Sequence, residues 1–136
     1  MELREFDFNK YFEDIKRIFK SANWSAYLQN DEKLKIAFKN SLYLLGAFEK
    51  NRLIGFIRCV GDGEHILLIQ DLIVDSDYYR QGIGTKLFKA VSKKYEDVRS
   101  FCLFTDIHDI RDNEFYKSLG MIKIEEKDII AYIRTL

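Results

Sequence analysis

Three apolar runs follow one another in the middle of the chain, and their short connectors constrain the fold more than any other feature. The runs cover residues 42–48, 53–60 and 66–74. The first connector is a polar tetrapeptide and the second is Gly61-Asp62-Gly63, and both are short enough for tight turns. Three strands joined in this way form an antiparallel meander.

Helical periodicity appears on both sides of this meander. Before it, a short strand over residues 3–6 precedes a helix with Asn9 as the expected N-cap, and a shorter helix that Asp31 is expected to cap. After it, the pattern predicts an amphipathic helix over residues 83–95, with lysines opposite the apolar stripe. The stripe consists of Ile83, Leu87, Phe88, Val91 and Tyr95.

The last third of the chain predicts further strands and one more helix. Residues 101–104 form a short apolar run, which would pair in parallel with the strand before the helix through a right-handed crossover. Residues 112–119 predict a short helix that Gly120 ends, and residues 121–125 and 129–134 predict two final strands. Together the elements predict one α+β domain over the whole chain, with a mixed sheet of six or seven strands and about four helices.

Composition narrows the class of protein. Lys and Arg number 22 and Asp and Glu number 22, so the net charge is zero, which argues against binding a nucleic-acid backbone. No apolar run is long enough to span a membrane, and the charged first residues do not resemble a signal peptide. Cys59 and Cys102 form no CxxC pair, and no Cys/His cluster suggests a metal. We therefore expect a cytoplasmic protein with reduced thiols and no metal.

A glycine-containing turn between the third run and the following helix is the main candidate for a binding site. Gly82 and Gly84 allow close approach of a ligand, and the first amides of the helix point at any anion bound there. Arg80 adds a positive charge and a guanidinium whose paired N–H donors suit phosphate oxygens. Thr85 and Lys86 lie in the first turn of the helix. The segment is neither a Walker A loop nor a GxGxxG fingerprint. By itself it fits a phosphate-binding turn or a purely structural one.

Three segments, in chain order, carry a resemblance to a known family. Residues 79–84 (YRQGIG) are similar to a cofactor motif that reads Arg/Gln-x-x-Gly-x-Gly/Ala, with Tyr79 at its first position. Residues 70–74 (QDLIV) look like the family's central strand, and residues 115–121 (FYKSLGM) look like its late FYxxLGF segment with Met121 last. The chain thus resembles the GCN-five-related N-acetyltransferase (GNAT) superfamily.

The resemblance implies transfer of an acetyl group from acetyl-CoA, the co-substrate, to the primary amine of a small molecule or peptide. It implies that the central strand splays from its parallel neighbour beside a bulge around Asp71 and Leu72. This frees backbone amides for the pantetheine arm and the thioester carbonyl, while the glycine turn holds the diphosphate. The cofactor-binding residues implied are Leu72, Ile73, Val74, Arg80, Gln81, Gly82, Ile83, Gly84, Thr85, Lys86, Asn113 and Tyr116.

Tyr116 and Asp71 are the catalytic candidates. Tyr116 matches the family's catalytic tyrosine. A phenol with a pKa of about 10 stays protonated where a thiol, at about 8.5, ionises, so it can stabilise or protonate the leaving sulfur. Packing between the short helix and the sheet is its alternative role. Asp71 is the first candidate for the general base, Glu64, His65 and His108 are others, and a water relay without a single base is the alternative.

The acceptor site is less well defined. Trp24, Tyr27 and Tyr43 lie in or beside the segment that resembles the family's acceptor wall, with core packing as the alternative for Trp24. Asp109 matches a cofactor-contacting asparagine, but a carboxylate repels phosphate, so N-capping by Asp109 or Asp112 is the expected role. The final strands of such folds often mediate dimers, so a homodimer is a candidate assembly. A non-catalytic acyl-CoA-binding module is the alternative function; acetylation of aminoacyl-tRNA is disfavoured by the balanced charge.

Overall fold

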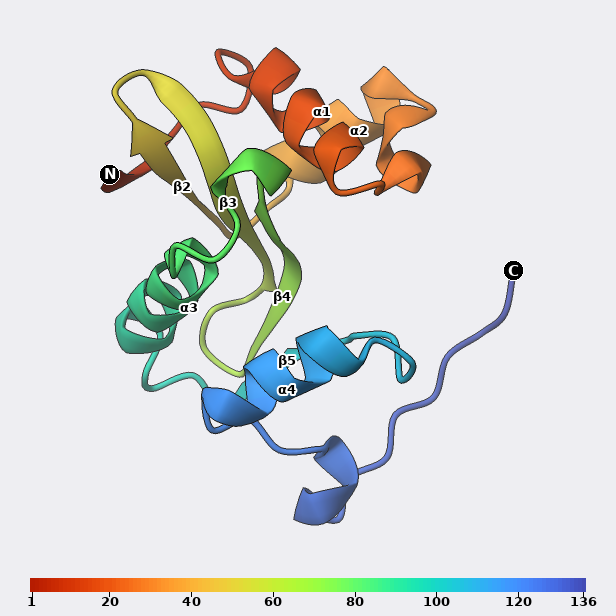
Figure 1. Ribbon diagram of the computed structural model, residues 1–136. Helices are drawn as coiled ribbons and strands as arrows, with labels where there is room; N and C mark the ends of the chain where they lie inside the picture. Colours follow the sequence, from red (N-terminus) through yellow and green to blue (C-terminus); the bar gives the residue numbers. More distant parts are fainter. The chain divides into compact units, whose positions relative to one another are not determined.

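The computed structural model describes residues 1–136, which divide into two compact units, Met1–Phe104 and Thr105–Leu136. The strands of the first unit are β1 (Glu2–Glu5), β2 (Tyr43–Glu49), β3 (Arg52–Gly61), β4 (Ile66–Val74) and β5 (Ser100–Leu103) (Figure 1). Its helices are α1 (Phe12–Ser21), α2 (Asp31–Lys39) and α3 (Ile83–Lys94), with the 3-10 turns η1 (Ser25–Leu28) and η2 (Ser76–Tyr78). The second unit contains α4 (Ile110–Ser118) and the 3-10 turn η3 (Ile124–Lys127).

The five strands form one mixed sheet in the order β1-β2-β3-β4-β5. Neighbours from β1 to β4 are antiparallel, whereas β4 and β5 run parallel. Lys50 (φ +56°) closes the hairpin between β2 and β3. Gly61 (φ +124°) ends β3, where an added Cβ would lie 2.4 Å from the carbonyl oxygen of Ile66. The predicted meander, the parallel strand after it and the α+β class are therefore confirmed.

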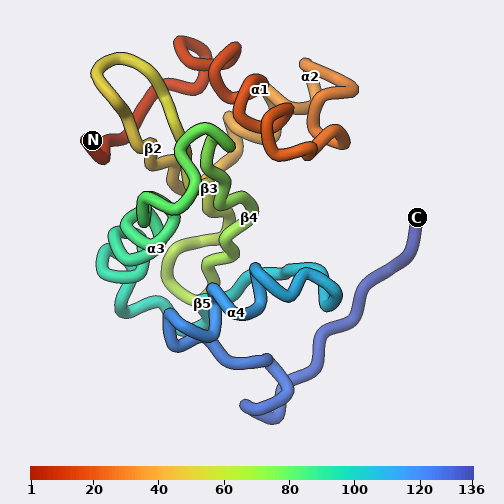
Figure 2. Tube along the Cα trace, viewed as in Figure 1, coloured from red at the N-terminus to blue at the C-terminus, as the bar shows by residue number.

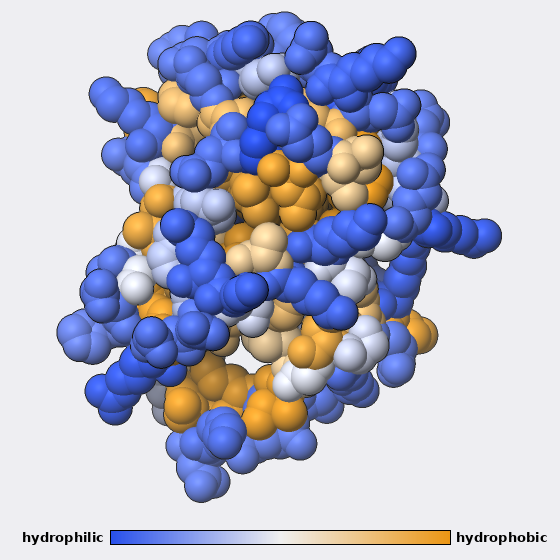
Figure 3. Space-filling model, turned by 90° about the vertical axis from the view of Figure 1, so that its left-hand side faces the viewer, coloured by the Kyte–Doolittle hydropathy of each residue, from blue (hydrophilic) through white to orange (hydrophobic).

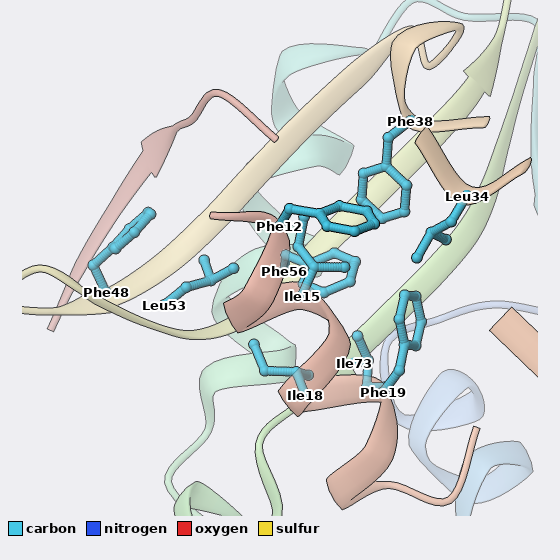
Figure 4. Close-up of a cluster of buried hydrophobic side chains, with 10 residues drawn as sticks. All are labelled: Phe12, Ile15, Ile18, Phe19, Leu34, Phe38, Phe48, Leu53, Phe56 and Ile73. Carbon is cyan, nitrogen blue, oxygen red and sulfur yellow. The ribbon is translucent and has the colours of Figure 1, made fainter. Parts of the chain in front are cut away.

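Helices cover both faces of this sheet, with α1 and α2 on one face and α3 on the other (Figure 1). Figure 4 shows the buried side chains that α1 and α2 share with the strands: Phe12, Ile15, Ile18, Phe19, Leu34, Phe38, Phe48, Leu53, Phe56 and Ile73. On the other face, the predicted stripe of α3 buries Ile83, Leu87, Phe88 and Val91. Hydrophilic side chains cover most of the molecular face seen in Figure 3. Burial on both faces fixes the strand that precedes the glycine turn and the helix that follows it.

The two strands predicted at residues 121–125 and 129–134 do not form, so the sheet has five strands rather than six or seven. A local turn forms instead, because the Glu126 carboxylate accepts a hydrogen bond from Lys123 N–H (2.9 Å) and Asp128 is left-handed (φ +59°). Alternating apolar residues favour an extended backbone. A strand also needs a neighbour to supply its ladder hydrogen bonds, and the sheet ends at β5 without adding one from this segment.

The caps predicted for the first two helices are displaced by one or two residues. Asn30 rather than Asp31 caps α2, because its Oδ1 accepts from Lys33 N–H (3.1 Å). Tyr11 rather than Asn9 precedes α1, and its side chain makes no capping hydrogen bond. A capping oxygen must reach an amide two or three residues ahead, so its exact position depends on where the packed helix begins.

Candidate active site

β4 leaves one backbone edge open along its C-terminal half. It pairs with β5 only over residues 66–69, so residues 70–74 have a neighbouring strand, β3, on one side only. Asp75 N–H donates to the Ile54 carbonyl of β3 (2.8 Å), and successive N–H groups along a strand point to opposite edges. The N–H groups of Leu72 and Val74 therefore point to the open edge. The open edge arises because all four residues of β5 pair with β4 and β5 then ends at Leu103, and Figure 2 traces the chain from this edge into α3.

A β-bulge begins the open segment. The register between β3 and β4 shifts between Ile69 and Asp71, which leaves Gln70 as the extra residue. The bulge expected around Asp71 and Leu72 therefore begins one residue earlier. Gln70 Nε2 donates to the hydroxyl of Tyr27 in η1 (3.2 Å), so the bulge is tied to the segment between α1 and α2. Bulges of this kind redirect side chains and end regular pairing beside functional sites.

A buried ion pair holds Asp71 at the bulge. Arg58 Nε donates to Asp71 Oδ2 (2.6 Å), and the two side chains are 4% and 0% exposed. The guanidinium also donates to the Ala37 carbonyl (3.3 Å) and the Ser41 hydroxyl (3.2 Å). Burial raises the pKa of Asp71, and the charge of Arg58 and hydrogen bonds with Arg58 and Tyr27 oppose the rise. Asp71 Oδ1 has no partner within hydrogen-bond distance and angle. Sequence reasoning missed Arg58, although a lone arginine in the apolar run 53–60 is itself a signal of a buried partner.

The turn into α3 presents backbone amides that the chain itself does not cap. Gly82, the residue before α3, is left-handed (φ +74°) and has no side chain to cap the helix. By contrast, Asn30 caps α2 and Asp109 caps α4, and both helices have acidic residues in the first turn, whereas α3 has none. The amides of Ile83, Gly84 and Thr85 therefore lack an intrahelical acceptor at the positive end of the helix dipole, and the first intrahelical bond runs from Lys86 N–H to the Gly82 carbonyl (3.1 Å). A left-handed residue followed by a helical one directs such amides into an anion-binding nest.

Open space and positive charge surround this turn. A Cβ built on Gly82 would meet no atom within 4 Å. Arg80 is also left-handed (φ +65°), a conformation uncommon outside glycine and concentrated at functional sites. Arg80 and Lys86 are exposed and make no ion pair within the chain. These features fit a diphosphate group, which needs amide donors, two cations and room beside the backbone.

The second unit contains the two remaining predicted site residues, Tyr116 and Asn113, on α4. Burial raises the pKa of the Tyr116 hydroxyl above its ordinary value, and the charges of Asp112 and Asp109 raise it further, so the hydroxyl stays protonated at neutral pH. Asn113 Nδ2 donates to the carbonyls of Asp106 (3.0 Å) and Asp109 (2.7 Å). Asp109 Oδ1 accepts from Asp112 N–H (2.9 Å), which confirms the predicted capping role.

The candidates for the general base occupy different places. Glu64 and His65 are exposed in the turn before β4, at the opposite end of this strand from the open edge. His108 is exposed in the second unit, in the loop before α4. Asp71 is the one candidate of the first unit that lies on the open half of β4.

The three aromatic residues expected at an acceptor wall are only partly brought together. Trp24 and Tyr27 stack on Phe19 of α1, with ring centroids 5.8 Å and 4.7 Å from it. Tyr43 packs instead against Tyr95, at the end of α3, with centroids 5.7 Å apart. Trp24 and Tyr27 are half-buried, so they both extend the core and present part of their rings to solvent.

Comparisons with known proteins agree with this fold. The model of the acetyltransferase (GNAT) family matches residues 8–121. An uncharacterized N-acetyltransferase, ycf52, from Gracilaria tenuistipitata var. liui is 33% identical over 123 residues, covering 85% of this chain and 65% of that protein. Its counterpart from Porphyra purpurea is 30% identical over 98 residues, covering 68% of this chain and 55% of that protein. The chain thus spans about 55–65% of the length of these curated relatives.

Solved structures extend the comparison. A GNAT family protein from Streptococcus pneumoniae TIGR4 has a TM-score of 0.81 at 28% identity, covering 99% of this chain and 96% of that chain. PaiA N-acetyltransferase from Thermoplasma acidophilum, in complex with coenzyme A, shares the fold at 18% identity, with a TM-score of 0.63 and 87% of each chain covered. The fold and its open-edged sheet define an acetyltransferase-type α+β protein. More particularly, the chain belongs to the GNAT family.

A metal ion needs a cluster of ligating side chains, and a membrane span needs a helix of sufficient length. No group of three or more His, Cys, Asp or Glu side chains is arranged to hold a metal ion. The longest helix, α3, has 12 residues, and none of the helices combines the length and apolarity that a bilayer crossing requires.

Proposed function

We propose that this protein transfers the acetyl group of acetyl-CoA to a primary amine on a small molecule or peptide. The observation that carries the proposal is the uncapped, acid-free start of α3 directly after the open edge of β4. A carrier with a diphosphate and an amide-containing arm matches both features, because the first needs free amide donors and the second an unpaired strand edge. The family match and the fold shared with a coenzyme A complex support this assignment.

The site residues take specific roles in this proposal. The backbone amides from Gln81 to Thr85 bind the diphosphate, and the side chains of Arg80 and Lys86 neutralise its charge. The open edge at Leu72, Ile73 and Val74 pairs with the pantetheine arm. The Leu72 and Val74 amides also donate hydrogen bonds to the thioester carbonyl oxygen. Asn113 and Tyr116, on α4, keep the cofactor-contacting roles that the family resemblance implies for them.

Acetyl-CoA supplies an activated thioester, and the protein supplies orientation and proton transfer. Tyr116 stabilises the departing sulfur by donating a hydrogen bond from its hydroxyl, or protonates it, since burial keeps this hydroxyl neutral over the physiological pH range. Asp71 takes up the proton of the attacking amine through a water rather than by direct contact, because its side chain is 0% exposed; Oδ1, the oxygen that has no hydrogen-bond partner, is the acceptor. The raised pKa of Asp71 makes its carboxylate a stronger base than an exposed aspartate. Trp24 and Tyr27 form the wall against which the acceptor binds.

Release of free thiol from acetyl-CoA in the presence of a panel of amines tests the proposal. We expect amine-dependent release by the wild-type protein, and a turnover number at least about tenfold lower for Tyr116→Phe, which still binds coenzyme A. Tyr132→Phe is the matched control, because it removes one hydroxyl from an exposed tyrosine of the same unit. Coenzyme A binding without thiol release for any amine would instead identify a non-catalytic acyl-CoA-binding module. Unchanged turnover for Tyr116→Phe across the pH range would remove Tyr116 from the mechanism.

A further inference from the structure

A buried carboxylate, Asp75, stands where β4 ends and the loop to α3 begins. The residue is 3% exposed. Its Oδ1 accepts from Asp77 N–H (3.0 Å), and its carbonyl accepts from Tyr78 N–H (2.8 Å), so it caps η2 in the first half of the loop. Its Oδ2 accepts from the Arg17 guanidinium, and Arg52 Nη2 lies 3.9 Å away. One side chain therefore connects the loop to two cations outside it.

The partner of Asp75 is itself fixed at several points. Arg17 Nη2 donates to the Leu53 carbonyl (2.6 Å) and lies 3.3 Å from the Asp14 carboxylate. Ser21, one turn further along α1, accepts a hydrogen bond at Oγ from Ser76 N–H (3.2 Å). Residues four apart share one face of a helix, so α1 holds the first two residues of the loop from a single face.

These contacts explain how a loop with an unfavourable backbone can be ordered before a ligand arrives. The loop contains left-handed Arg80 and Gly82, and a non-glycine residue in this conformation persists only where its surroundings impose it. An exposed carboxylate at Asp75 would also repel an anion at the start of α3. Burial and pairing with Arg17 remove most of that repulsion.

We propose that Asp75, held by Arg17, is the positioning residue that presets the diphosphate-binding loop for coenzyme A. The inference rests on the proposed function for its ligand, but the ordering of the loop is a property of the free protein. A binding site that is formed for only a fraction of the time binds more weakly by that fraction. Loss of the pair therefore weakens coenzyme A binding without removing any group that contacts it.

Four variants and one control distinguish the loss of the Asp75–Arg17 ion pair from a general loss of stability. Asp75→Asn loses the charge but keeps an oxygen that can accept from Asp77 N–H, whereas Asp75→Ala loses both. Arg17→Met removes the guanidinium, and Arg17→Lys restores a cation. Lys16→Met is the control, because Lys16 occupies the adjacent position on α1 and pairs with Asp31 (3.1 Å) rather than with the loop.

Hydrogen exchange of the free protein and calorimetric titration with coenzyme A are the measurements. We expect faster exchange of the amides from residue 77 to residue 81 in Asp75→Asn, and faster still in Asp75→Ala, with the core of the sheet unchanged. We expect coenzyme A affinity to fall by about fivefold in Asp75→Asn and about tenfold or more in Asp75→Ala, and to recover in part in Arg17→Lys relative to Arg17→Met.

Wild-type exchange rates in the loop of Asp75→Ala would overturn the inference, and so would equal weakening of binding by Lys16→Met. If the wild-type protein did not bind coenzyme A, the proposed function would fail, while the exchange data would still decide whether Asp75 orders the loop.

Discussion

Replacing Gly82 by alanine would separate two properties of the turn into α3, its left-handed backbone and its open surface. At φ +74° an alanine is strained by about 1 kcal/mol relative to glycine. No atom lies within 4 Å of the added Cβ, so the backbone strain is the whole cost to the free protein. We expect the melting temperature to fall by about 3–6 °C. If the diphosphate lies against this surface, the methyl group meets the ligand, and coenzyme A affinity falls by about tenfold or more, about 1.4 kcal/mol.

Gly120 provides a closely matched control. It is also left-handed (φ +86°), and an added Cβ there also meets no atom within 4 Å. Gly120→Ala should therefore lower the melting temperature by a similar amount. Its coenzyme A affinity should stay within about twofold of wild type, as measured by calorimetric titration. Wild-type affinity in Gly82→Ala, or an equal loss in Gly120→Ala, would refute the assignment of the diphosphate to the start of α3.

Two further predictions concern stability. The N–H groups of Ile66, Glu64 and His65 lower the pKa of Asp62 from 3.8 to about 2, so its stabilising contribution is present above pH 3.8 and disappears as the pH falls through 2. In urea unfolding, Asp62→Ala should therefore be less stable than wild type at pH 7 and indistinguishable below pH 2; a constant difference would contradict this. Arg58→Met should cost about 3–5 kcal/mol by leaving Asp71 buried and unpaired, and adding Asp71→Leu should recover most of the loss.

The antiparallel meander and the position of its turns could be predicted from the sequence because their signals are local. The apolar runs, the polar connector at residues 49–52 and the stripe of α3 each specify their own element. The last two strands could not be predicted correctly, because apolar alternation shows a preference for extended backbone but does not show whether a neighbouring strand is present. The local hydrogen bond from Lys123 to Glu126 decides that segment in favour of a turn.

The sequence by itself determined the glycine turn, the strand before it and the helix after it, because turn residues and hydrophobic periodicity act over a few neighbouring positions. Only the tertiary structure decided which amides remain free, since this depends on where β5 stops pairing with β4. It also decided which charges meet: Arg58 and Asp71 are 13 positions apart, and Arg17 and Asp75 are 58 apart. Such pairs form because folding buries them together, and no local pattern in the chain specifies the partner.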